Sequence, residues 1–295
     1  SWEFAAMPVA TFPLILLVIF YAVMFLFAAL YVKGGTLSGK TPPLNAGSGT
    51  HGRGSAARTM SGWGLSAAMS LAALPFDRAF VAWVALQSAL LLTCWVWAWR
   101  RFGPDALVFG ALFAPAALGV QHGQDCVLFL MVVVGFYILA GRNRDLWAGA
   151  VLALGLAKFH LFLLWPVILV LTRRWRALAG FSAAASILGG ASFALGGSAS
   201  QYLSLLRMKD LERLSPSPEQ MVNVHSFAAN FGIQSATLSF ALGALVVVAT
   251  IAATWRAPLW RLVAAASCGS LLAAPHVYGY DAALLLAAVW LAIFE

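Results

Sequence analysis

Lys158 is the residue of this chain with the clearest chemical potential, because it lies inside an apolar stretch between Ala157 and Phe159. An ammonium group in such an environment is costly unless it is paired, hydrated or functional. The functional interpretation is a compact cation that binds a phosphate group. The alternative is a side chain that extends its charged end to the water interface. His160 lies two residues further on, either as a second phosphate ligand or as a packing histidine.

Two carboxylates stand where apolar runs begin. Asp125 closes the motif Gln121-His-Gly-Gln-Asp125, and Asp281 closes Ala274-Pro-His-Val-Tyr-Gly-Tyr-Asp281. A carboxylate can act as a general base on an attacking hydroxyl, but it can equally cap the free N–H groups at a helix start. Asp125 is the candidate catalytic carboxylate. The candidates for contact with a sugar or an acceptor are Gln121, Gln124, His276, Tyr278 and Asp281.

A further polar stretch, residues 199–235, contributes His225 and Asn230 as candidates for acceptor contact. Its charges between Arg207 and Arg213 are spaced three and four residues apart, which is also typical of a solvated surface helix. The acidic and histidine side chains here lack the spacing of metal ligands, so no metal site is predicted.

The composition requires a membrane around these polar residues. The chain of 295 residues is 62% hydrophobic and 9% charged, with a mean hydropathy of +0.88. Its apolar runs of about 17–25 residues match the thickness of a bilayer, and a backbone in lipid satisfies its hydrogen bonds as helices. The alternating ten-residue pattern of a barrel is absent. The net charge of +8 reflects arginine and lysine kept on the cytoplasmic side, and no nucleic-acid partner is predicted.

Basic clusters recur at one end of successive apolar runs. They are Arg100–Arg101, Arg142/Arg144, Arg173/Arg174/Arg176 and Arg256/Arg261. We expect all four in the cytoplasm. All five histidines then fall at or near the opposite face, which predicts a polar site on the extracytoplasmic side. The three cysteines lie in apolar segments without paired spacing and are expected to pack as small hydrophobic residues.

We therefore predict an all-α polytopic protein with about eight to ten spans, some of them short or broken. The whole chain, 1–295, forms one membrane domain. Its parts are a first span at 8–32, an external loop with an interfacial helix at 33–76, a helical core at 80–198, an external loop at 199–235 and C-terminal spans at 236–295. Residues 146–172 lie between two arginine clusters, so two half-spans meeting near Lys158 are expected, with a single pass as the alternative.

Several of these motifs occur together in an order that resembles the glycosyltransferase 87 family. They are Gln121-His-Gly-Gln-Asp125, Leu154-Gly-Leu-Ala-Lys158, Arg173-Arg-Trp-Arg-Ala177 and Ala274-Pro-His-Val-Tyr-Gly-Tyr-Asp281, preceded by Leu74-Pro-Phe-Asp-Arg-Ala79. The resemblance covers about Trp63 to Asp281. This family of polytopic membrane enzymes includes bacterial mannosyltransferases that use polyprenyl-phosphomannose.

The resemblance implies a GT-C architecture and transfer of a hexose, with mannose as the first expectation. The donor would be a polyprenyl-phosphate sugar and the acceptor a lipid or glycan at the outer face of a bacterial-type inner membrane, with no cofactor. In this scheme Lys158 and His160 bind the donor phosphate, and the other candidates border the sugar and the acceptor.

One departure from the family concerns the expected catalytic acid, which follows the first span. Residues 33–62 contain no Asp or Glu. The acid could lie upstream of Ser1, the loop could come from a shifted reading frame, or the protein could be a degenerate relative without transferase activity. A small-solute or lipid transporter is the rival from another functional class. Enzymatic activity is therefore an open alternative on sequence grounds.

Overall fold

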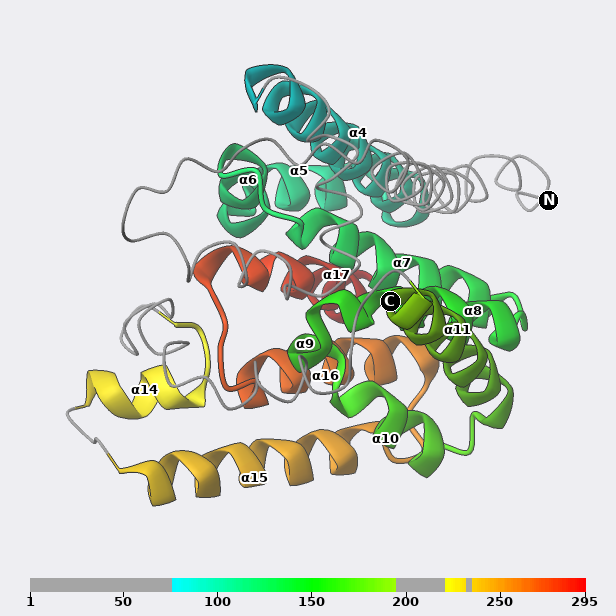
Figure 1. The fold of residues 1–295 in the computed structure, drawn as a ribbon, viewed down its shortest axis with the longest axis vertical. Coiled ribbons are helices and arrows are strands. Elements are labelled where there is room, and N and C mark those ends of the chain that lie inside the picture. The colour runs from blue at the N-terminus through cyan, green and yellow to red at the C-terminus, as the bar shows by residue number, and fades with distance from the viewer. Residues whose placement is uncertain (1–75, 195–220, 232–234) are drawn as a thin grey trace, which may run out of the picture.

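A computed structural model describes residues 76–194, 221–231 and 235–295. The expected first span at 8–32, nearly all of the loop at 33–76 and most of the loop at 199–235 lie outside the described residues. The described part is helical and contains no strand (Figure 1). The all-α prediction is therefore confirmed.

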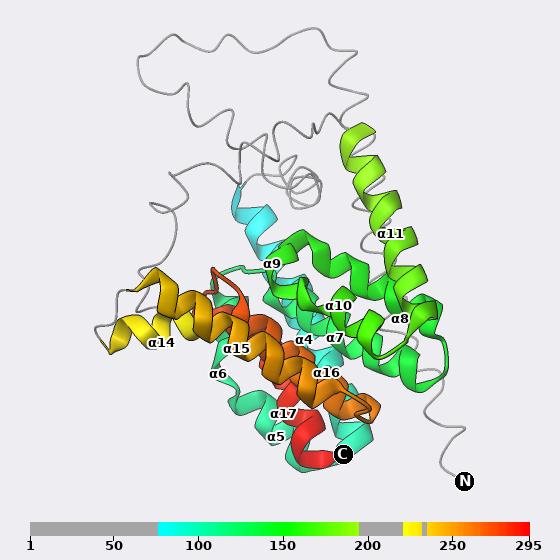
Figure 2. The same cartoon turned by 90° about the horizontal axis from the view of Figure 1, so that it is seen from below.

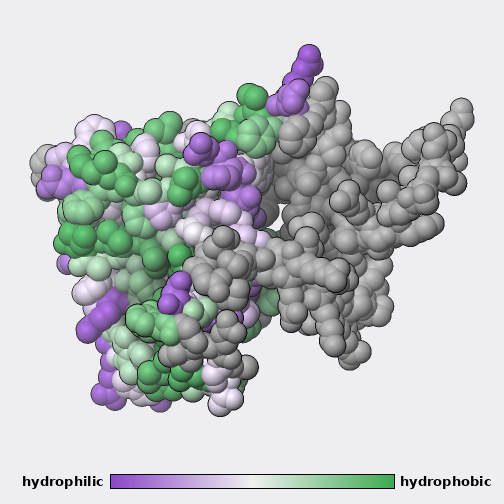
Figure 3. Space-filling model, turned by 90° about the vertical axis from the view of Figure 1, so that its left-hand side faces the viewer, coloured by the Kyte–Doolittle hydropathy of each residue, from purple (hydrophilic) through white to green (hydrophobic). Residues whose placement is uncertain are grey.

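Four of the described helices are long and apolar enough to cross a membrane, and a fifth crossing is added if one bent pair counts as a single span. Three shorter apolar helices complete the bundle: Cys126–Gly141, Leu259–Ala273 and Gly279–Phe294. Apolar side chains cover much of the face drawn in Figure 3. Such a surface fits contact with lipid, so the chain is a multi-pass membrane protein.

Helix α7 (Cys126–Gly141) forms the centre of the bundle. Almost all of its side chains are buried, as expected for a helix that is apolar on every face. Helices α4 (Phe76–Phe102), α16 (Leu259–Ala273) and α17 (Leu285–Phe294) pack against it. Helix α15 (Ala236–Thr254) covers α16 on the outside (Figure 1). Cys94 and Cys126 are buried free thiols, in agreement with the sequence prediction.

Residues 104–121 form two helices with a sharp bend between them. Helix α5 (Pro104–Leu112) and helix α6 (Ala114–Gln121) meet at Phe113 with a bend of 54°. Pro115 lies at the start of α6. Proline has no N–H to donate into the preceding turn, and its ring disfavours helical conformation before it. The turn 122–125 then connects the end of α6 to the start of α7.

Residues 145–171 form short helical pieces rather than one long helix. Helix α8 (Asp145–Leu152) leads into the 3-10 helix η1 (Ala153–Lys158), followed by α9 (Phe159–Phe162) and α10 (Leu164–Leu171). The backbone of Lys158 leaves the helical region, with φ −118° and ψ 63°. The segment starts and ends near the same point, because Asp145 and Arg174 lie 3.4 Å apart. Helices α8, η1 and α9 together form one of the four long apolar runs, Asp145–Phe162, so two half-spans meeting near Lys158 and a single pass both remain predictions.

Helix α11 (Trp175–Ala194) packs closely on α8. A Cβ atom on Gly149 would lie 1.7 Å from the carbonyl oxygen of Ala177, and one on Gly180 would lie 1.8 Å from that of Leu146. Only glycine permits this approach of two helix backbones. The second half of α11 projects beyond the neighbouring helices (Figure 2), and Ile187 there is exposed.

The arginine clusters lie together at one end of the bundle. Arg101, at the end of α4, contacts Glu295 after α17, and Tyr137 near the end of α7 donates a hydrogen bond to the same carboxylate. Asp145, just after Arg144, pairs with Arg174. The first residue of α16 lies close to Gly141, at the end of α7. The prediction that the four clusters share one end therefore agrees with the structure.

Candidate functional site

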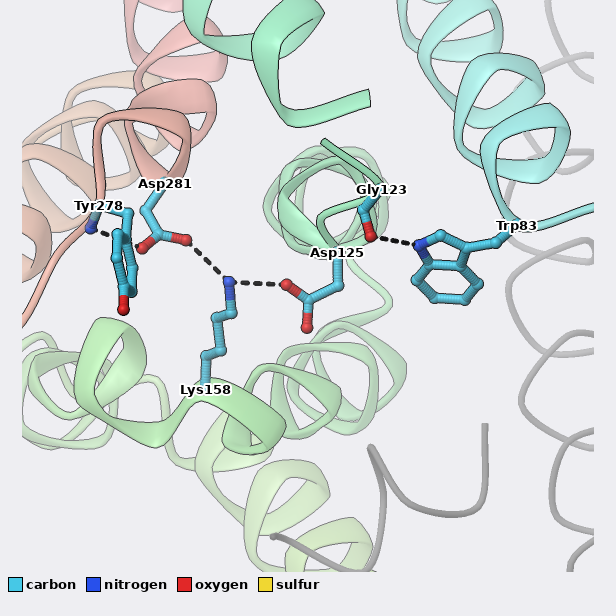
Figure 4. A network of polar contacts seen from close by, with 6 residues as sticks. All are labelled: Trp83, Gly123, Asp125, Lys158, Tyr278 and Asp281. Atoms are coloured by element: carbon cyan, nitrogen blue, oxygen red, sulfur yellow. Dashed lines mark hydrogen bonds and ion pairs between the residues drawn. The ribbon is translucent and has the colours of Figure 1, made fainter. Parts of the chain in front are cut away.

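Lys158 joins two carboxylates that come from distant parts of the sequence. Its Nζ lies 2.6 Å from Oδ1 of Asp125 and donates a hydrogen bond of 2.8 Å to Oδ1 of Asp281 (Figure 4). Lys158 ends η1, Asp125 precedes α7, and Asp281 belongs to the 3-10 helix η3 (Gly279–Leu284). The three side chains therefore connect three segments of the chain. Lys158 contacts two carboxylates, which the snorkelling alternative does not account for.

Asp281 is the buried member of this triad, with 2% of its side chain exposed. Its second oxygen, Oδ2, accepts a hydrogen bond of 3.0 Å from the backbone N–H of Tyr278. This contact is part of a capping box at the start of η3. The helix-cap interpretation of Asp281 and its contact with Lys158 therefore hold at once, one oxygen serving each.

Asp125 is the accessible member, with 37% of its side chain exposed. It occupies the N-cap position of α7 but makes no capping hydrogen bond with its side chain. The capping interpretation is therefore wrong for Asp125, whose side chain is turned toward Lys158 instead. Figure 4 shows the second carboxylate oxygen pointing away from the lysine.

The turn that carries Asp125 is held by α4. Trp83 Nε1 donates a hydrogen bond of 2.7 Å to the carbonyl oxygen of Gly123 (Figure 4). Gly123 has φ +64°, and a Cβ atom there would lie 2.8 Å from the ring of Phe80. Glycine is thus required both by the backbone conformation and by the contact. Gln121, the last residue of α6, is exposed, and Gln124, beside Asp125 in the turn, is half-buried.

Aromatic rings enclose the ammonium group. Lys158 Nζ lies 5.5 Å from the ring centroids of both Phe129 and Tyr280, a distance at which a cation is attracted to the ring face. Tyr280 stacks on Tyr278 with centroids 5.0 Å apart and an interplanar angle of 12°. The sequence identified Tyr278 as a candidate, but the position of Tyr280 beside the lysine follows only from the fold.

Two of the predicted histidines border this group of rings. His276 contacts the ring of Tyr278 at 4.8 Å between centroids, and His160 lies 6.3 Å from His276. His276 belongs to the connection between α16 and η3, where desolvation lowers its pKa below 6.5 and Lys158 lowers it further, against the opposing charge of Asp281. The neutral imidazole is therefore favoured, so His276 is suited to hydrogen bonding rather than to holding a positive charge.

His225 and Asn230 lie on helix α14 (Val224–Asn230), where the structure shows other partners for them. His225 Nδ1 lies 3.0 Å from the hydroxyl of Ser239, and Asn230 donates to Ser226. Neither residue has a contact with the triad among the interactions of the described residues. Both remain predictions as acceptor contacts.

Asn223 is the buried residue that connects α14 to the site. Its side-chain oxygen caps α14 by accepting from the N–H of Ser226 at 2.8 Å, and its Nδ2 donates to the carbonyl oxygen of Ala274 at 3.0 Å. Ala274 begins the connection that carries His276, Tyr278 and Asp281. Asn223 lies in the same stretch, 199–235, as the predicted acceptor contacts His225 and Asn230. Asparagine is a preferred residue at the start of a helix, whereas its second contact, with Ala274, follows only from the fold.

The triad carries one positive and two negative charges inside a partly closed site. A cation in this position can stabilise a phosphate, and an accessible carboxylate beside it can accept a proton. Among the described residues, no group of three or more His, Cys, Asp or Glu side chains is arranged to hold a metal ion.

Comparison with known proteins identifies the family. The model of glycosyltransferase family 87 matches residues 64–278, a region that includes Asp125 and Lys158 and ends three residues before Asp281. No curated protein and no solved structure shows significant similarity to the chain. The match spans well over half of the sequence, and the chain belongs to glycosyltransferase family 87.

Proposed function

We propose that this membrane glycosyltransferase transfers a hexose, with mannose as the first candidate, from a polyprenyl-phosphate donor to a lipid or glycan acceptor. The reaction takes place at the outer face of a bacterial-type inner membrane. The observation that carries this proposal is the position of Lys158, a half-buried cation that touches an accessible carboxylate 2.6 Å away. Family membership supports the transfer of a sugar.

Lys158 and the aromatic rings around it suit the donor. The ammonium group would contact the phosphate that links the lipid to the sugar. The stacked rings of Tyr278 and Tyr280, with His276 beside them, would border the sugar. His160 would lie next to the same phosphate, and Gln121 and Gln124 would border the sugar from the turn before α7. His225 and Asn230 would approach the acceptor from α14.

The placement of charge supports the outer face. The triad lies at the start of α7 and the arginine clusters lie around its end, so one helix of 16 residues separates them. At about 1.5 Å per residue this helix is about 24 Å long, close to the hydrocarbon thickness of a membrane. Positive residues are retained in the cytoplasm, and this tendency supports a position of the triad on the opposite side.

Asp125 bears on the question raised by residues 33–62. That loop has no acidic residue and lies outside the described part of the structure. Transfer to a hydroxyl acceptor is assisted by a carboxylate that accepts the proton of that hydroxyl, and Asp125, 2.6 Å from Lys158, would supply one without the loop. We therefore favour an active transferase over an inactive relative or a transporter.

The decisive experiment is a transfer assay on the purified chain in lipid, using polyprenyl-phosphomannose as donor and isolated membranes as acceptor. We expect Lys158→Met to reduce transfer by at least about a hundredfold, because the substitution keeps the length of the side chain but removes the charge that holds the leaving phosphate. Arg261→Gln is the matched control, since Arg261 is an exposed cation at the other end of the bundle. Its transfer rate should be unchanged.

Loss of Lys158 also leaves Asp281 buried without its charged partner, which can unfold the protein. The double variant Lys158→Met/Asp281→Asn removes both charges and keeps the oxygen that caps η3. We expect it to fold but not to transfer sugar. Full turnover in a well-folded Lys158 variant would contradict the proposal, and so would a wild-type protein that is inactive with both mannose and glucose donors.

A further inference from the structure

The two carboxylates that hold Lys158 differ in a way that suggests a sequence of events. Asp281 is fixed on both oxygens, by Lys158 and by the N–H of Tyr278, and only 2% of its side chain is exposed. Asp125 has 37% of its side chain exposed and makes no capping hydrogen bond at α7. Separation of Lys158 from Asp281 would leave a carboxylate buried without its charge partner, whereas separation from Asp125 would leave one that water can reach.

We propose that the donor phosphate replaces Asp125 as the second partner of Lys158, and that Asp125 released in this way is the base that activates the acceptor. The inference rests on the proposed function, because it assumes that a polyprenyl phosphate binds at Lys158. Phosphate and Asp125 compete for the same ammonium group, since like charges at contact distance disfavour each other. Asp281 stays in place and keeps the lysine oriented.

The transfer step then balances in atoms and charge. The acceptor hydroxyl gives its proton to Asp125, and its oxygen forms a bond with the anomeric carbon of the sugar. The bond between that carbon and the phosphate oxygen breaks, and its electron pair stays on the phosphate. The phosphate gains one negative charge as Asp125 loses one, so the total charge around Lys158 is unchanged. Before the donor arrives, Oδ1 of Asp125 is occupied by Lys158 at 2.6 Å.

This exchange predicts that loss of the base improves binding of the phosphate. The probe is farnesyl phosphate, a short isoprenyl monophosphate, and its binding to the full chain in lipid nanodiscs is measured by calorimetry. We expect Asp125→Asn to lower its Kd on the order of tenfold, because the competing charge is gone, while sugar transfer falls by at least about a hundredfold. Asp105→Asn is the matched control, since Asp105 is an exposed aspartate on α5. It should change neither quantity.

The possible results test the exchange and the proposed function separately. If wild-type protein binds farnesyl phosphate and Lys158→Met does not, but Asp125→Asn binds it equally or more weakly, the exchange is wrong and the proposed function stands. If Asp125→Asn binds more tightly but still transfers sugar at the normal rate, Asp125 is not the base. If Lys158→Met binds the probe as wild type does, both proposals fail. Asp125→Ala repeats the test with a side chain that cannot hydrogen bond.

Discussion

The two ends of the bundle both contain ion pairs, but the pairs serve different purposes. At the arginine end, Arg174 and Asp145 lie 3.4 Å apart with about a quarter of each side chain exposed, so water screens their attraction. At the other end, Lys158 touches two carboxylates at 2.6 and 2.8 Å, and one of them is almost fully buried. Exposed arginines are expected to be retained in the cytoplasm, whereas an ionisable group away from water is costly and marks a candidate functional site.

The largest effect on stability should come from the end of the bundle that holds Lys158 and Asp281. Asp281→Ala removes the buried partner of Lys158 and the acceptor for the N–H of Tyr278. We expect a loss of stability of about 3–5 kcal/mol, the range found when one member of a buried ion pair is deleted. Thermal unfolding of the protein in detergent measures this loss.

Asp281→Asn refines the same comparison, because asparagine keeps the oxygen that caps η3 and removes only the charge. Its loss of stability should be clearly smaller than that of the alanine variant. Equal losses would mean that the charge, and not the cap, accounts for the whole effect; no loss in either variant would show that the triad does not stabilise the fold.

An intermediate effect is expected at Asn223, which joins α14 to the connection that carries Asp281. Asn223→Ala loses the helix cap, worth about 1 kcal/mol, and leaves the carbonyl of Ala274 without this donor, at a cost of about 1–3 kcal/mol. Asn223→Ser keeps a capping oxygen but does not reach Ala274.

The difference between the two Asn223 variants therefore separates the effect of the helix cap from that of the hydrogen bond to Ala274. If the hydrogen bond to Ala274 positions the site, the serine variant has a lower kcat than wild type. Its thermal transition should still lie above that of the alanine variant, because it keeps the helix cap. If both variants keep wild-type kcat, Asn223 is structural only.

The smallest effect belongs to the arginine end. Asp145→Asn should change stability by about 1 kcal/mol or less, because its partner Arg174 is reached by water. The small difference from wild type should shrink further in high salt, since salt screens exposed charges. Chemical unfolding at low and high salt tests both statements. A loss as large as that of Asp281→Ala would remove the distinction between the two ends.

Local patterns predicted most of the elements. Apolar run lengths predicted the membrane helices, and the spacing of arginines placed both ends of 146–172 on one side, in line with the contact between Asp145 and Arg174. The bend at Phe113 was missed, although Pro115 is a local signal for it. Asp125 could be interpreted equally as a cap or as a site residue, because both uses place an aspartate before a helix.

The sequence by itself determined that this chain is a helical membrane protein with four arginine clusters at one end, because bilayer thickness and charge retention act on each segment separately. Only the tertiary structure decided which charges meet. Lys158 and Asp281 are 123 residues apart, and their contact depends on how α7, η1 and η3 pack together. It also decided that Asp281 is buried while Asp125 is accessible, since burial is a property of the neighbours that the fold brings to each residue.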